Sequence, residues 1–142
     1  MTVKRALKEK NKLIKEINEL YTKIKTYNSV SDDSEKPYST KELLSNIDSK
    51  LNELVELKTK IHLANGPVYD KIFRMAELKS HVSKLNQLDC SSGKQKSWGD
   101  TEYTNKVSEI KIVDRDYLIK VSEEEIEKLQ DELDEFNATT NI

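Results

Sequence analysis

This sequence of 142 residues is poor in the residues that interrupt helices or cross-link chains. Three glycines and two prolines leave long stretches uninterrupted, which favours long helices. The single cysteine excludes a disulfide framework and a cluster of thiolate metal ligands. No apolar run approaches the roughly 18 residues of a membrane span, and the N-terminus lacks the continuous apolar segment of a signal peptide. We therefore expect a cytoplasmic protein that does not enter membranes.

Charged residues are abundant, but the two signs nearly cancel. The chain has 24 basic and 26 acidic residues, a formal net charge of -2, which argues against bulk binding to nucleic acid. Residues 1–27 hold 8 basic and 3 acidic groups, whereas residues 116–142 hold 2 basic and 9 acidic groups. Because opposite charges select neighbours, we predict that the first and last helices lie side by side, within one chain or between chains. The alternative is two solvated faces that happen to differ.

Apolar residues recur at helical spacing in four segments. The predicted helices cover about residues 2–27, 40–64, 68–89 and 116–137. In the last of them the apolar column is Ile119, Ser122, Ile126, Leu129, Leu133 and Phe136. In the first, steps of four and three residues connect Val3, Leu7, Lys10, Ile14, Ile17, Tyr21 and Ile24, and a parallel column holds Ala6, Leu13, Leu20 and Tyr27. A stripe this wide favours packing against two neighbours.

The segments between the helices predict the remaining architecture. Asn65-Gly66-Pro67 ends the second helix, with a left-handed turn expected at Gly66. Residues 90–105 indicate a long loop, and the β-branched residues of 107–113 indicate a short extended segment. We predict a mainly α fold, a single domain over residues 1–142 built as an antiparallel bundle of long helices. Wide apolar stripes with few large aromatic residues also predict a homo-oligomer.

Motifs for catalysis or metal binding are absent from the sequence. His62 and His81 belong to no HExxH or HxxxH pair, and Cys90 has no CxxC partner. The three scattered glycines form no phosphate-binding loop. We therefore expect no enzymatic activity, no cofactor and no metal ion.

One candidate binding region lies at the predicted start of the third helix. Tyr69, Lys71, Phe73 and Arg74 fall within two helical turns. A helix N-terminus presents free N–H groups and positive potential, so the region suits an anionic ligand. The alternative is that Tyr69 and Phe73, four residues apart, pack in the core and leave Arg74 exposed.

A second candidate region is the long loop, which carries Lys94, Lys96, Trp98 and Tyr103. Exposed aromatic rings can stack on a base while neighbouring lysines contact phosphate. The alternative is that Trp98 anchors the loop to the bundle. Arg115, which follows the expected extended segment, can serve either region.

Several short motifs resemble a family of small helical bacterial proteins. They are Asn65 at a helix end, Arg74 ahead of Glu77-Leu78, SEIK at residues 108–111 and FNATT at residues 136–140. Together they resemble the septicolysin-like family over nearly the whole chain. The resemblance implies a helical fold, and polar residues such as Lys111 that gather at subunit interfaces and line a pocket. The membrane insertion implied by the family label finds no apolar segment here.

These observations lead to one function hypothesis and one alternative. In outline the chain is similar to small oligomeric phage proteins that sequester nucleotide immune signals. We predict a non-catalytic homo-oligomer that binds a small anionic ligand such as a nucleotide through Tyr69, Lys71, Arg74, Trp98, Tyr103, Lys111 and Arg115. This hypothesis expects the three basic groups Lys71, Arg74 and Arg115 to converge with Tyr69 or Trp98. The alternative is a helical adaptor or structural interaction protein without a small-molecule pocket, which would expose an apolar groove.

Overall fold

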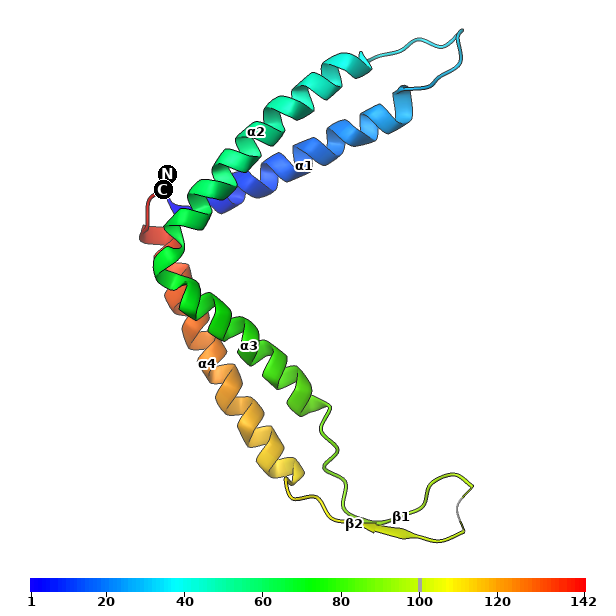
Figure 1. The fold of residues 1–142 in the computed structure, drawn as a ribbon, viewed down its shortest axis with the longest axis vertical. Helices are drawn as coiled ribbons and strands as arrows, with labels where there is room; N and C mark the ends of the chain where they lie inside the picture. The colour runs from blue at the N-terminus through cyan, green and yellow to red at the C-terminus, as the bar shows by residue number, and fades with distance from the viewer. Residues whose placement is uncertain (100) are drawn as a thin grey trace. The chain divides into compact units, whose positions relative to one another are not determined.

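The computed structural model describes residues 1–99 and 101–142 and consists mainly of α-helices (Figure 1). Its elements in chain order are α1 (Val3–Tyr27), α2 (Thr40–Ala64), the 3-10 helix η1 (Gly66–Val68), α3 (Tyr69–Asn86), β1 (Gly93–Gln95), β2 (Thr104–Lys106) and α4 (Ile112–Thr139). The predicted mainly α class and antiparallel helix packing are confirmed. The chain divides into two units, Met1–Pro67 with Asp134–Ile142, and Val68–Leu133, so the single domain stays a prediction.

In the first unit, α1 and α2 form an antiparallel hairpin (Figure 1). Each helix begins at a hydroxyl cap: Thr2 Oγ1 accepts the Arg5 N–H, and Ser39 Oγ accepts the Glu42 N–H. An ion pair between Lys50 Nζ and Glu16 Oε2, 2.7 Å long, joins the two helices near their middle. The bounds of both helices agree with the predicted ranges.

The two helices meet along one seam, defined here as the facing positions that recur at alternating steps of three and four residues. Every seam residue is buried or half-buried. The seam of α1 is Val3, Ala6, Lys10, Leu13, Ile17, Leu20, Ile24 and Tyr27, and that of α2 is Thr40, Leu43, Ile47, Lys50, Leu54, Leu57, Ile61 and Ala64. This pattern is that of a two-stranded antiparallel coiled coil.

The seam uses only part of the wide stripe predicted for α1. The column Leu7, Ile14 and Tyr21 runs beside the seam, with Ile14 37% and Tyr21 49% exposed. On α2, Leu44 and Leu51 occupy the equivalent positions and are 48% and 36% exposed. We call Ile14, Tyr21, Leu44 and Leu51 the apolar flank.

The two ends of the chain pair with each other in the first unit. Val3 N donates to Thr140 O over 2.8 Å, and Ile142 N donates to Met1 O over 3.0 Å. The last residues of α4 therefore meet the first turn of α1 (Figure 1). Along its length, α1 pairs with α2, and side-by-side pairing of the first and last helices within one chain stays a prediction. Pairing of the first and last helices between chains stays a prediction.

In the second unit, α3 and α4 form another antiparallel pair (Figure 1). Ion pairs connect Lys71 with Glu132 and Arg74 with Glu125. The apolar column predicted for the last helix, Ile119 to Phe136, is buried or half-buried throughout. Helix α3 is shorter than predicted, because it ends at Asn86 rather than near residue 89.

The prediction of an extended segment at residues 107–113 is wrong, because the strands of the structure lie earlier in the chain. The paired strands β1 and β2 lie inside the predicted loop of residues 90–105, with Lys94 opposite Asn105. Helix α4 already begins at Ile112, because the Asp114 carboxylate accepts the N–H of Lys111 at 3.2 Å and organises the first turn. Ile112 and Val113 of this segment therefore enter a helix, since β-propensity yields to local capping, whereas Val107 and Ile110 precede it.

The left-handed turn predicted at Gly66 is also wrong. Gly66 opens η1, whereas positive φ angles occur at Gly93 (104°) and Gly99 (90°). Pro67 lies within η1, where its fixed φ is compatible with a helical turn and its missing N–H costs no hydrogen bond.

Candidate functional site

The start of α3 presents aromatic and basic side chains that engage neighbours in their own unit. The rings of Tyr69 and Phe73 stack with centroids 5.5 Å apart at 18°. Phe73 is 63% exposed, so the alternative that this residue packs in the core is wrong. Lys71 Nζ donates to Glu132 Oε2 over 2.7 Å, and this hydrogen bond raises the pKa of Lys71 and lowers that of Glu132.

Arg74 is paired with an acid from α4. Its Nε and Nη2 donate to the two carboxylate oxygens of Glu125 over 3.1 and 3.3 Å, and the pKa of Arg74 is raised by this bidentate contact. Beside the pair lies an open groove of about 420 Å³, lined by Arg74, Glu77, Leu78, His81, Val121, Ser122 and Glu125. On the α3 side the groove has three ionisable residues, Arg74, Glu77 and His81. The positive charge of Arg74 is already compensated by Glu125.

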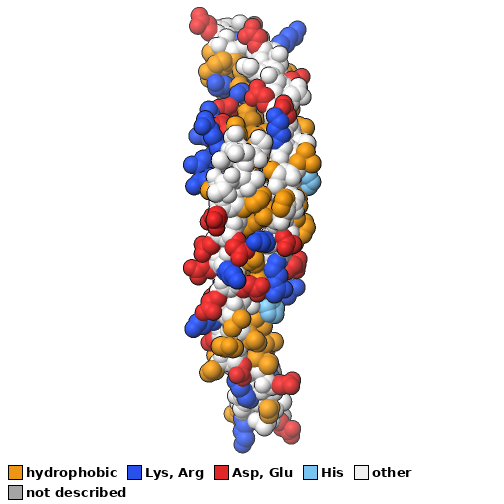
Figure 2. All heavy atoms as spheres, turned by 90° about the vertical axis from the view of Figure 1, so that its left-hand side faces the viewer, with side chains coloured by type: hydrophobic (Ala, Val, Ile, Leu, Met, Phe, Trp, Pro, Cys, Tyr) orange, Lys and Arg blue, Asp and Glu red, His pale blue; other side chains and the backbone are white. Residues whose placement is uncertain are grey.

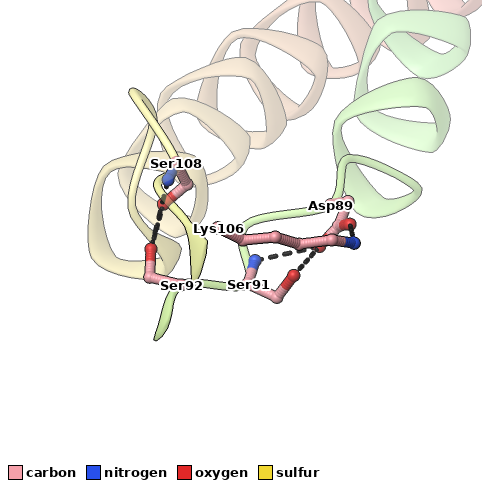
Figure 3. Close-up of polar contacts among 5 residues, drawn as sticks. All are labelled: Asp89, Ser91, Ser92, Lys106 and Ser108. Carbon is pink, nitrogen blue, oxygen red and sulfur yellow. Dashed lines mark hydrogen bonds and ion pairs between the residues drawn. The ribbon is translucent and has the colours of Figure 1, made fainter. Parts of the chain in front are cut away.

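A polar network closes the base of the β1–β2 hairpin (Figure 3). Asp89 Oδ1 accepts hydrogen bonds from the backbone N–H and the hydroxyl of Ser91, and Lys106 Nζ lies 3.4 Å from Asp89 Oδ2. Across the hairpin, the hydroxyls of Ser92 and Ser108 are 2.9 Å apart. The Ser91 hydroxyl, the Ser91 N–H and the Lys106 ammonium together lower the pKa of Asp89 to about 2. Each of these groups holds the hairpin in place.

The tip of the hairpin carries the most exposed aromatic residue of the described chain. Trp98 has its full surface in contact with solvent, so the alternative in which it anchors the loop to the bundle is wrong. Lys96 Nζ lies 5.6 Å from the centroid of the Tyr103 ring, and Tyr103 is itself 69% exposed. The hairpin thus gathers a free indole, a phenol ring and a lysine at one end.

Lys111 and Arg115 form contacts at the start of α4. Lys111 Nζ donates to the Ser108 carbonyl oxygen over 2.6 Å. The Arg115 guanidinium contacts Asp116 Oδ1 at 3.1 Å. Lys111 thereby contacts the segment that leads from β2 into α4, whereas Arg115 pairs with its neighbour inside α4.

The residues predicted to form one anion site lie in separate local contacts. Lys71 and Arg74 each hold a carboxylate of α4, and Arg115 holds the neighbouring Asp116. The groove beside Arg74 includes neither Lys71 nor Arg115, and Trp98 lies on the hairpin tip. Whether these residues bind a ligand stays a prediction.

A second surface is not identified as a site from the sequence. The apolar flank lies beside the α1–α2 seam, and Val55 on α2 is 63% exposed four residues after Leu51. Figure 2 shows apolar side chains at the surface among charged ones on one face of the molecule. On α1 the signal in the sequence is the width of the apolar stripe, but periodicity alone cannot tell which residues of the stripe face the partner helix.

Among residues 1–99 and 101–142, no group of three or more His, Cys, Asp or Glu side chains is placed to hold a metal ion. Cys90 is buried as a free thiol. No helix in the same ranges has the length and apolar character needed to cross a membrane.

The fold and these surfaces define a mainly α protein that contains two antiparallel helix pairs and a short β-hairpin. Comparisons with protein-family models, with curated proteins and with solved structures find no match to this chain. The resemblance to the septicolysin-like family therefore stays a prediction.

Proposed function

We propose that this chain is a non-catalytic helical interaction protein that acts by association, first of all with copies of itself. The observation that carries the proposal is the distribution of apolar side chains. Among the described residues, ten hydrophobic residues are buried, whereas twenty large hydrophobic residues are exposed. Scattered apolar residues are normal on a surface, but contiguous ones mark interaction sites. On α1 and α2 the exposed residues follow helical columns, which is typical of a helix face that receives another helix.

The electrostatic contacts support the same function. Three of the four cations predicted to bind an anion, Lys71, Arg74 and Arg115, are paired with carboxylates of the same chain. The fourth, Lys111, donates to a carbonyl oxygen. Ion pairs of this kind stabilise and orient helices, whereas a binding site for an anion needs cations whose charge is not already compensated.

Sedimentation velocity and light scattering of the full chain test this function directly. We expect a reversible oligomer whose mass rises with concentration between about 5 and about 200 µM, the affinity range of modest interfaces. A protein that remains a monomer over this range, and that captures no copy of itself in cross-linking, would contradict the proposal.

A second candidate function is binding of a nucleotide at the hairpin tip, as the sequence predicts. The exposed Trp98 indole, with Lys96 beside Tyr103, favours it because an unshielded indole is a stacking surface for a base. Sequestration of a nucleotide immune signal would be one use of such a site.

Trp98 is the only tryptophan in the chain, so its fluorescence reports on the tip without labelling. Titration with ATP and with a cyclic dinucleotide should quench the emission if a base stacks on the indole. Lys94→Gln with Lys96→Gln should weaken binding, whereas Lys58→Gln with Lys60→Gln on α2 serves as a control that removes the same two charges. Emission that stays unchanged up to about 1 mM ligand would rule out this candidate, because a Kd above that concentration corresponds to a binding free energy of less than about 4 kcal/mol.

A further inference from the structure

The apolar flank is the part of the α1–α2 hairpin that lacks a neighbour in its own unit. A stripe as wide as that of α1 suits two neighbours, and α2 is one of them. At the base of the hairpin the end of α4 supplies a second, because Lys4, Leu7 and Lys8 share a groove with Asp134 and Asn137. Beyond this point the column continues through Ile14 and Tyr21, which are 37% and 49% exposed.

The register of the hairpin places all four residues of the apolar flank on the same side. With Lys50 beside Glu16, antiparallel pairing puts Leu51 across from Ile14. One heptad further along α1, Leu44 lies across from Tyr21. The flank therefore consists of two apolar pairs, one heptad apart, that bridge the two helices.

The opposite side of the same seam has a different chemistry. A groove there is lined by Glu9, Leu13, Glu53, Leu57 and Lys60, together with Met1 and Glu56. The ion pair of Glu16 with Lys50 lies on that side as well, and the hydrogen bond between them lowers the pKa of Glu16 and raises that of Lys50. One side of the hairpin is thus charged and internally paired, and the other is apolar.

We propose that the apolar flank is a dimer interface, on which the same flank of a second copy packs to form a four-helix bundle of two α1–α2 hairpins. The inference rests on the proposed function and names its partner and its surface. A second copy offers a matching occupant, because an isologous contact brings Ile14, Tyr21, Leu44 and Leu51 of one copy against the same four residues of the other.

The available area is sufficient for such a contact. The uncovered part of α1, residues 11–27, is about 25 Å long, and two helices side by side are about 20 Å wide. Each copy therefore offers about 500 Å², so the dimer buries about 1,000 Å², which reaches the size of a specific but reversible interface. The groove that contains Ile14 is also lined by the uncharged Asn11, Asn18 and Thr22, and by Lys15 and Glu19, whose opposite charges sum to zero.

Charge selects the orientation of the two hairpins. Helix α1 has 8 basic and 3 acidic residues, whereas α2 has 4 of each sign. Packing α1 on α1 of the second copy brings two basic helices together, which costs free energy, and packing α1 on α2 avoids this contact. A two-fold axis parallel to the helices satisfies this preference and makes all four neighbouring helices antiparallel. It also places the two turns of residues 28–39 at the same end of the dimer.

Equilibrium sedimentation of the full chain and of matched variants tests the interface. Ile14→Gln with Leu44→Gln should raise the dimer Kd by at least about 100-fold, because four apolar side chains are lost per dimer. Leu63→Gln makes the same kind of change on α2, at a residue 72% exposed away from the flank, and should leave the Kd unchanged. Helical circular dichroism should be the same in all three proteins, because glutamine is a good helix former and the replaced residues are partly exposed.

The outcomes separate the two proposals. A wild-type monomer overturns the proposed self-association and this interface with it. A wild-type oligomer that the flank substitutions leave intact, or that Leu63→Gln disrupts equally, overturns the interface and leaves the proposed function standing.

A distance measurement tests the orientation. Spin labels attached through Ser34→Cys in a Cys90→Ser background report the separation of the two 28–39 turns. We expect about 20–30 Å, the width of a four-helix bundle. A separation beyond about 40 Å, the length of a helix of 25 residues, would place the turns at opposite ends and overturn the cross-packed arrangement.

Discussion

At the residue scale, two cations of the candidate site have specific acidic partners. Lys71 and Arg74 lie one turn apart on α3 and contact Glu132 and Glu125, which are more than 50 positions away in sequence. The sequence identifies the basic residues, but a contact over such a separation depends on the register of α3 against α4. The residue types of the candidate site could therefore be predicted, and their pairing could not.

Asp89 provides a test of the polar network at the hairpin base. Its folded pKa of about 2 lies below the ordinary value of 3.8, with the Ser91 hydroxyl as the largest cause. A depressed carboxyl pKa contributes stability that is complete above the unfolded value and is lost as the pH falls through the folded value. We therefore expect hairpin protection to decline between about pH 4 and about pH 2.

Carbon-13 detected titration of the side-chain carboxyls measures this directly. The Asp89 midpoint should rise towards the ordinary value in Ser91→Ala, since both the hydroxyl donor and part of the local order are lost. An Asp89 midpoint close to the ordinary value of 3.8 in the unsubstituted protein would show that the network does not hold the carboxylate.

Ile17 and Ile14 offer a matched pair for locating the seam. They are the same residue type three positions apart on α1, but Ile17 is 6% exposed and Ile14 is 37% exposed. Ile17→Ala should lower the free energy of unfolding by about 2–4 kcal/mol through the cavity it leaves, and Ile14→Ala by less than about 1.5 kcal/mol. Urea unfolding at low protein concentration, where association does not contribute, gives both values. Equal losses would mean that the column of Ile14 also faces α2.

At the element scale, long helices could be predicted because many residues contribute to one period. The helices predicted at 2–27 and 40–64 match α1 and α2 within one residue. The β1–β2 hairpin could not be predicted, because its strands, Gly-Lys-Gln and Thr-Asn-Lys, are three residues long and contain no apolar alternation. Its position depends instead on the contacts of Asp89 and Ser92 with Lys106 and Ser108. Likewise, the start of α4 depends on one carboxylate, Asp114, rather than on the β-branched residues around it.

Substitution of Gly93 tests how the backbone conformation supports the β1–β2 hairpin. Gly93 has a φ of 104°, which side chains with a Cβ rarely adopt, although no heavy atom lies within 4 Å of the position that a Cβ would occupy there. Gly93→Ala should therefore cost about 1–2 kcal/mol through backbone strain alone. Hydrogen exchange of the β1 and β2 amides should accelerate, while the helical circular dichroism stays the same.

Gly66→Ala is the control for this substitution. Gly66 has equally open space and a φ outside the left-handed region, so alanine should be neutral or stabilise by about 0.4–1 kcal/mol through the unfolded chain. Equal effects of the two substitutions would contradict the role assigned to the positive φ of Gly93.

At the scale of the whole molecule, the net charge of -2 conceals an uneven distribution. Residues 1–27 carry a net charge of +5, from 8 basic and 3 acidic groups, and residues 116–142 carry -7, from 2 and 9. We expect the opposite charges of these two stretches to attract each other between chains. This charge attraction and the contact through the apolar flank should respond differently to salt, because salt screens exposed charges and leaves apolar contacts intact or strengthened.

We therefore expect two kinds of association that differ in their salt dependence. At about 0.01 M salt the screening length is about 30 Å, and the basic stretch of one copy should attract the acidic stretch of another to give species larger than a dimer. At about 0.15 M and above the screening length falls to about 8 Å or less, and only the dimer through the apolar flank should remain.

Arg5→Glu with Lys12→Glu lowers the charge of residues 1–27 from +5 to +1, since each substitution changes it by two, and both positions lie away from the flank. In sedimentation velocity this variant should lack the larger species at low salt and keep the dimer at all salt concentrations. Larger species that persist in the variant, or a dimer that dissociates as salt rises, would mean that charge rather than apolar contact holds the copies together.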